Sequence, residues 1–87
     1  MISIVYGSSF LKSAKKLPAK IQIKLSKQLS LIGENPFHSL LHTKSLTGKL
    51  AGFYSFRITR DWRVIFQFLQ KDKIQLLQAD NRKDIYK

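Results

Sequence analysis

The chain has 87 residues, and 16 lysines and arginines against 5 aspartates and glutamates give it a net charge of +11. This length is typical of a single domain, residues 1–87, with a modest core. The absence of cysteine excludes disulfides and thiolate metal sites. We expect a cytoplasmic protein without a signal peptide or membrane span, because no apolar stretch reaches about 18 residues. The charge predicts a polyanionic partner: nucleic acid, a ribosome or an acidic protein.

The N-terminal part of the chain predicts a strand followed by two helices. Residues 2–6 are mostly β-branched or aromatic, which favours a strand that Gly7 ends. Apolar residues then recur at helical spacing up to about Leu17. Pro18 suits the first turn of a second helix, and Gly33 suits its C-terminal cap. The core-facing stripe expected on this second helix is Ile21, Leu25, Leu29 and Ile32.

The rest of the chain changes to the periodicity of strands. We expect residues 34–50 to form a loop, followed by strands over 54–58, 62–68 and 73–78. The order β-α-α-β-β-β predicts an α+β fold in which a small antiparallel sheet packs against the N-terminal α-hairpin. The polar C-terminus offers two possible anchors, Ile85 and Tyr86.

The strand register expected for the central hairpin predicts a candidate site. A three-residue loop over 59–61 pairs Ile58 with Trp62 and gathers the aromatic side chains on one face, where Trp62 would pack in the core. The same register sets Arg57 opposite Arg63 on the other face. Two facing arginines repel each other, whereas a bound phosphate would turn that repulsion into bidentate recognition. The alternative is an ordinary solvated basic face.

Most of the excess charge lies in residues 1–60, where Glu34 is the sole acidic residue. Three lysines of the second predicted helix are spaced i, i+4, i+7 and form one stripe. Such a stripe is either simply solvated or contacts RNA phosphates. The lysines that we assign to RNA binding are Lys12, Lys16, Lys20, Lys24, Lys27 and Lys49.

Two segments carry a resemblance to a known family. The string LHTKSLTGKLAGFYSFRITRDWRVIFQF, followed by a strand and DNRKDIYK, resembles the RelE/ParE superfamily of bacterial toxin–antitoxin toxins, and within it the RelE-, StbE- and YafQ-like messenger-RNA endonucleases. The resemblance implies a RelE-like fold and a ribosome-dependent endoribonuclease that inhibits translation. It also implies a ribosome with bound messenger as target and a cognate antitoxin as partner.

The resemblance further implies a set of catalytic positions in the loop, on the open face of the sheet and at the C-terminus. No histidine stands at any of them, and Ser55 replaces a strand lysine of RelE-like members. We expect His38 and His42 to be ordinary loop residues. The implied catalytic set is Lys44, Arg57, Asp61, Arg63, Arg82 and Tyr86.

Chemical reasoning suggests how these groups would cleave RNA without a metal or cofactor. Acidic residues are few and scattered, so no metal site is expected. Arg57 and Arg63 would stabilise the charge of the phosphorane formed by attack of the 2′-hydroxyl. Lys44 or Tyr86 would act as base, because neighbouring cations favour a deprotonated group. Arg82 would contact the phosphate or the leaving group.

Two other functions remain compatible with the sequence. One is a ParE-like toxin that inhibits DNA gyrase without cutting RNA, and the other is an inactive basic protein that binds RNA or ribosomes. Either toxin would need an antitoxin whose acidic or amphipathic segment covers the basic groove or the helical hairpin.

Overall fold

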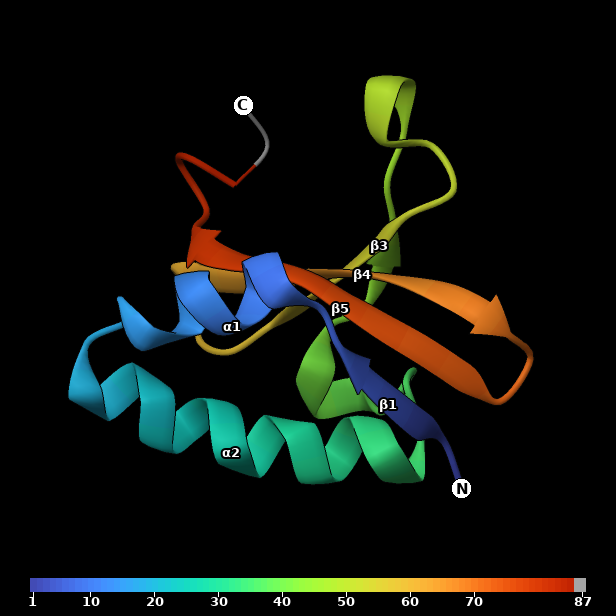
Figure 1. The fold of residues 1–87 in the computed structure, drawn as a ribbon, viewed down its shortest axis with the longest axis horizontal. Coiled ribbons are helices and arrows are strands. Elements are labelled where there is room, and N and C mark those ends of the chain that lie inside the picture. Colours follow the sequence, from blue (N-terminus) through green and yellow to red (C-terminus); the bar gives the residue numbers. More distant parts are fainter. Residues whose placement is uncertain (86–87) are drawn as a thin grey trace.

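Five strands form one sheet in the order β1-β5-β4-β3-β2, and two helices pack against one of its faces (Figure 1). This computed structural model describes residues 1–85. In chain order the elements are β1 (Ser3–Tyr6), α1 (Ser8–Lys15), α2 (Ala19–Glu34), η1 (Ser39–Leu41), β2 (Lys44–Ser45), η2 (Gly48–Leu50), β3 (Tyr54–Arg57), β4 (Trp62–Gln70) and β5 (Lys73–Asn81).

The predicted α+β fold is confirmed, with one difference in the direction of a strand. β1 pairs with β5 in parallel, whereas the neighbouring pairs β5–β4, β4–β3 and β3–β2 are antiparallel. A hairpin turn forces antiparallel pairing only between consecutive strands. Because two helices and three strands separate β1 from β5 along the chain, no turn sets the direction of β1. No helix within residues 1–85 is long and apolar enough to cross a membrane.

The core lies between the helices and one face of the sheet. Phe10 of α1 and Leu25 and Ile32 of α2 meet alternate residues of the strands, such as Phe66 and Leu76. All five are buried. The stripe predicted for the second helix is therefore confirmed: Leu25 and Ile32 lie in the core, and Ile21 and Leu29 pack against it. Trp62 also packs against this core, as its predicted register requires.

The central hairpin has the predicted register. Phe56 lies opposite Val64, and Arg57 lies opposite Arg63. The backbone N–H of Ile58 donates to the carbonyl of Trp62 at 2.8 Å, which leaves residues 59–61 as the loop. The pairing was predictable because a shift by one residue would move the aromatic side chains out of the core.

Several element boundaries differ from the prediction, among them the ends of β4 and β5, which run to Gln70 and Asn81 instead of residues 68 and 78. α2 continues through Gly33 to Glu34, and Asn35 is the first residue with an extended backbone (φ −159°, ψ 110°). The helix ends there because Pro36 disfavours the helical conformation of the residue before it. The predicted loop 34–50 contains the short strand β2, which pairs with Tyr54 and Ser55 at the edge of the sheet.

Gly7 is needed where the chain turns from β1 into α1. A Cβ atom on Gly7 would lie 2.6 Å from the carbonyl oxygen of Leu76, which is backbone and cannot move aside cheaply. The same oxygen accepts a hydrogen bond from the Gly7 N–H at 3.0 Å. A Cβ on Gly33, inside α2, would meet no described atom within 4 Å beyond its chain neighbours and the backbone of its own helix. Replacement by alanine should therefore change the free energy of unfolding in opposite directions at the two glycines.

We expect Gly7→Ala to lower the free energy of unfolding by about 1–3 kcal/mol, the usual cost of an overpacked position. Gly33→Ala should raise it by about 0.4–1 kcal/mol, because alanine restricts the unfolded chain and favours the helix. Urea denaturation of both variants measures the difference. A Gly7→Ala protein as stable as the wild type would show that the β1–α1 turn can relax away from Leu76.

Candidate functional site

The face of the sheet opposite the helices, here called the open face, carries a row of charged residues. Side chains alternate between the two faces along each strand, so directly paired residues share a face. Arg57 of β3 pairs with Arg63 of β4, and Arg63 pairs with Asp80 of β5. The sheet therefore places two guanidinium groups and one carboxylate side by side across three strands.

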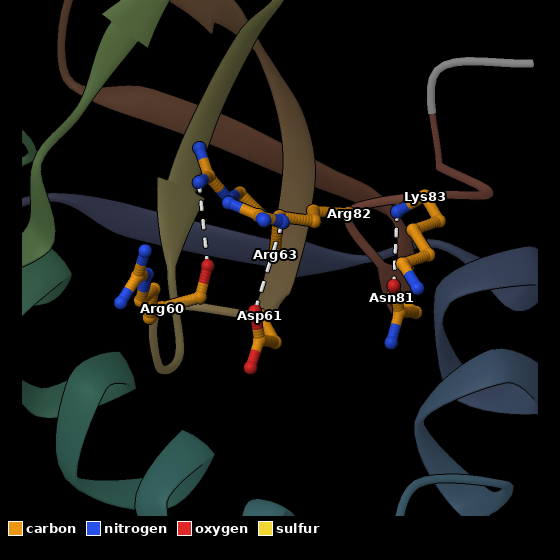
Figure 2. Close-up of polar contacts among 6 residues, drawn as sticks. All are labelled: Arg60, Asp61, Arg63, Asn81, Arg82 and Lys83. Atoms are coloured by element: carbon orange, nitrogen blue, oxygen red, sulfur yellow. Dashed lines mark hydrogen bonds and ion pairs between the residues drawn. The ribbon is translucent and has the colours of Figure 1, made fainter.

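The two arginines of this row are partly buried and incompletely bonded. Arg63 exposes only 8% of its surface, and Arg57 is half-buried. The Nε atoms of both side chains are buried and have no hydrogen-bond partner among residues 1–85. The Nη2 of Arg63 donates to the carbonyl of Arg60 at 3.3 Å (Figure 2). A buried charged donor without an acceptor is costly, so this pair is suited to an anionic ligand.

Lys44 joins the same face through β2. It lies opposite Ser55 in the register of β2 and β3, and Ser55 pairs in turn with Ile65 of β4. Lys44 is thus one row away from Arg57 and Arg63. Its side chain is exposed, whereas Ser55 is buried. The short strand β2 is what orients Lys44 toward the site.

Asp61 and Arg82 lie together at the end of the hairpin. The backbone N–H of Arg82 donates to the Asp61 carbonyl at 2.8 Å, and the Arg82 Nε lies 3.6 Å from the Asp61 Oδ1. The side chain of Asp61 is 61% exposed and that of Arg82 is 45% exposed, so solvent screens the ion pair and it contributes little to stability. Figure 2 shows Arg82 extending toward Asp61. The tail after β5 is thereby attached to the hairpin turn.

The end of the described chain lies against the open face. Ile85 is 3% exposed and lines an apolar cavity of about 290 Å³ with Phe53, Ile65 and Leu77. The prediction that Ile85 anchors the C-terminus is confirmed. Tyr86, the remaining member of the predicted catalytic set, lies outside the described residues.

Comparison with solved structures identifies the fold. YafQ from E. coli strain BL21(DE3) superposes with a TM-score of 0.81 at 18% identity, over 100% of both chains. A YoeB/ParE toxin from Agrobacterium tumefaciens gives a TM-score of 0.77 at 20% identity, over 93% of this chain and 99% of that one. The E. coli DinJ–YafQ toxin–antitoxin complex gives 0.78 at 17% identity, over 99% and 98%. No family model and no curated protein matches the sequence.

The chain has the fold of the RelE/ParE toxins. The resemblance inferred from the sequence is confirmed at the level of the fold, and the full coverage of YafQ shows that it extends along the whole chain. On this RelE-like sheet, five of the six predicted catalytic residues fall on the open face or at its rim: Lys44, Arg57, Asp61, Arg63 and Arg82.

The lysines assigned to RNA binding divide into two groups in the RelE-like fold. Lys49 of η2 lines a cavity of about 390 Å³ with Lys44 and therefore lies near the site. Of the other five, four lie on the helices, which cover the opposite face of the sheet, and Lys16 directly follows α1. Among these five, Lys12 of α1 and Lys16 line a cavity of about 480 Å³ beside Trp62. All six side chains are exposed. Their contact with RNA stays a prediction.

Residues 1–85 contain no group of three or more histidine, aspartate or glutamate side chains arranged to hold a metal ion. Asp61 is near Arg82, and the Oδ1 of Asp80 accepts the backbone N–H of Asn81 at 2.7 Å.

Gln28 holds the backbone of β3 at Arg57 through a hydrogen bond. It was not among the site residues expected from the sequence. It is 4% exposed in α2, and its Nε2 donates to the Arg57 carbonyl at 2.9 Å and to the Leu40 carbonyl at 3.3 Å. The Gln28 side chain thus supplies a hydrogen-bond donor to β3 at Arg57, beyond the point where β2 ends. The signal in the sequence was its position three residues after Leu25 and four before Ile32, on the core-facing stripe.

We expect Gln28→Leu to reduce the free energy of unfolding by about 1–3 kcal/mol, because two carbonyl oxygens lose a donor that comes from a buried side chain, while side-chain volume is nearly kept. Ser30→Ala, at an exposed position of the same helix, is the matched control and should change stability by less than about 0.5 kcal/mol. Thermal or urea denaturation measures both. A Gln28→Leu protein as stable as the control would mean that these hydrogen bonds contribute no net stability.

Proposed function

We propose that this protein is the toxin of a toxin–antitoxin system and acts as a ribosome-dependent endoribonuclease that cuts messenger RNA. The observation that carries the proposal is the facing pair Arg57–Arg63, whose buried Nε atoms lack an acceptor within the described part of the chain. A phosphate oxygen is the type of acceptor that such guanidinium groups bind best. Lys44 and Arg82 add further positive charge around the same pair.

The proposed reaction is an attack of the ribose 2′-oxygen on the adjacent phosphorus. The P–O5′ bond breaks, so the products are a 2′,3′-cyclic phosphate and a 5′-hydroxyl end. Arg57 and Arg63 would hold the non-bridging oxygens and stabilise their growing charge in the transition state. Lys44 or Tyr86 would take the proton of the 2′-hydroxyl. Arg82, oriented by Asp61, would contact the leaving 5′-oxygen, which takes a proton from solvent water as it departs.

An antitoxin is the expected protein partner. The E. coli relative is described in complex with its antitoxin DinJ. A net charge of +11 would attract an acidic or amphipathic segment to the open face or the helical hairpin. A ribosomal target places the protein in the cytoplasm.

Cleavage on programmed ribosomes tests the proposal. Purified protein is added to ribosomes that carry a defined messenger, and primer extension maps new 5′ ends. We expect cuts within the A-site codon and much slower cleavage of the same messenger without ribosomes. A messenger that stays intact while the protein inhibits gyrase supercoiling would favour the ParE-like alternative. An intact messenger on ribosomes that bind the protein would favour an inactive binder.

A further inference from the structure

A further cavity lined by basic residues lies beside Arg57, at the edge of β3. β2 pairs only with Tyr54 and Ser55, so the edge of β3 is free of a partner strand at Arg57. There α2 and the segment after η1 approach the strand, and Gln28 bonds to the Arg57 carbonyl. Between them lies a groove of about 250 Å³, here called the edge groove.

The edge groove is lined by basic residues from four separate segments. Lys24 comes from α2, His42 follows η1, Arg57 ends β3 and Arg60 belongs to the hairpin loop. None of the described residues that line it is acidic. His42, expected to be an ordinary loop residue, thus shares a cavity with Arg57. Cations that converge without a carboxylate repel one another unless an anion binds between them.

We propose that the edge groove is a second phosphate subsite for the RNA, next to the one between Arg57 and Arg63. This inference rests on the proposed function, and it predicts the path that the RNA backbone follows across the protein. Arg57 belongs both to the facing pair with Arg63 and to the edge groove. An RNA chain whose reacting phosphate lies on the open face would therefore bring a neighbouring phosphate to Lys24 and Arg60. The backbone would then cross the edge of β3 toward α2.

This path gives the lysine stripe of α2 a connection to the site. Lys24 lines the edge groove, whereas Lys20 and Lys27 of the same stripe do not. Single-stranded nucleic acids are commonly held by a basic groove that follows the backbone. Lys24 would therefore bind a specific phosphate, and Lys20 and Lys27 would add only general attraction.

Binding of short uncleavable RNAs of two lengths tests the subsite. Each RNA carries a 2′-deoxyribose at the cleaved position, and the longer set has one additional nucleotide at the 5′ or the 3′ end. Fluorescence anisotropy measures affinity at several salt concentrations for wild type, Lys24→Ala, Arg60→Ala and the matched control Lys27→Ala. The additional nucleotide should strengthen wild-type binding at one end only.

For that longer RNA, Lys24→Ala and Arg60→Ala should each weaken binding on the order of tenfold at low salt and reduce the salt slope by about 0.7. The shorter RNA should bind these variants nearly as well as wild type. Equal losses for both RNAs, or a loss no larger than that of Lys27→Ala, would overturn the subsite. Losses of the same size for a poly-glutamate peptide would assign the groove to an acidic protein segment instead.

The proposed function and the subsite fail in different ways. Wild-type protein that neither binds these RNAs nor cuts messenger on ribosomes would overturn the proposed function. Wild-type protein that does both, with groove variants that behave like Lys27→Ala, would overturn the subsite alone.

Discussion

Replacement of Arg63 by alanine is expected to slow cleavage of ribosome-bound messenger by about 10²–10³-fold, the usual effect of removing one preorganised donor from a transition state. Arg63 is the more deeply buried member of the facing pair, so little water can replace its charge. Arg57→Ala should have a similar effect. Single-turnover cleavage on programmed ribosomes measures the rates.

Two controls separate chemistry from folding. Arg63→Lys keeps the charge but loses the planar fork, so its rate should fall between those of wild type and Arg63→Ala. Lys71→Ala, at an exposed turn between β4 and β5, should leave the rate unchanged. Denaturation curves show which variants are folded. A folded Arg57→Ala or Arg63→Ala protein that cuts at the wild-type rate would refute the assignment of the pair.

Replacement of Phe66 by alanine should cost about 3–5 kcal/mol of unfolding free energy. The side chain is fully buried, and its ring lies 5.7–5.9 Å from the rings of Tyr54, Phe56 and Phe68. Small domains have about 5–15 kcal/mol of stability in total, so this one change should remove much of it. Urea denaturation at one temperature measures the loss.

Exposed Leu69, three residues further along β4, is the matched control for Phe66. Leu69→Ala should change stability by no more than about 0.5 kcal/mol, because its side chain is partly in solvent. Phe66→Leu should cost less than Phe66→Ala, because the smaller cavity loses fewer contacts. Similar effects of Phe66→Ala and Leu69→Ala would mean that the core is not centred on the aromatic cluster.

The hairpin was predictable from sequence because local rules determined it. Phe56, Val64 and Phe66 must share one face, and only one register with a short loop achieves this. That register placed Arg57 opposite Arg63 without any knowledge of the rest of the fold. Two of the candidate catalytic positions could thus be paired from periodicity alone.

Features that depend on distant segments were not predictable. The parallel pairing of β1 with β5 joins residues about 70 positions apart, and no turn residue signals it. β2 has only two residues, so it has no periodicity of its own. Gln28 was visible as a polar residue on an apolar stripe, but its acceptors on Arg57 and Leu40 come from other elements.

The sequence by itself determined the type of fold, the hairpin register and the excess of positive charge, because each follows from composition or from spacing within one segment. The tertiary structure decided which charges meet. Lys24 and Arg57 are 33 positions apart in the sequence, yet they line one groove because α2 crosses the open edge of β3. Electrostatic interaction depends on distance in space, so the division of the lysines between the helices and the site could come only from the fold.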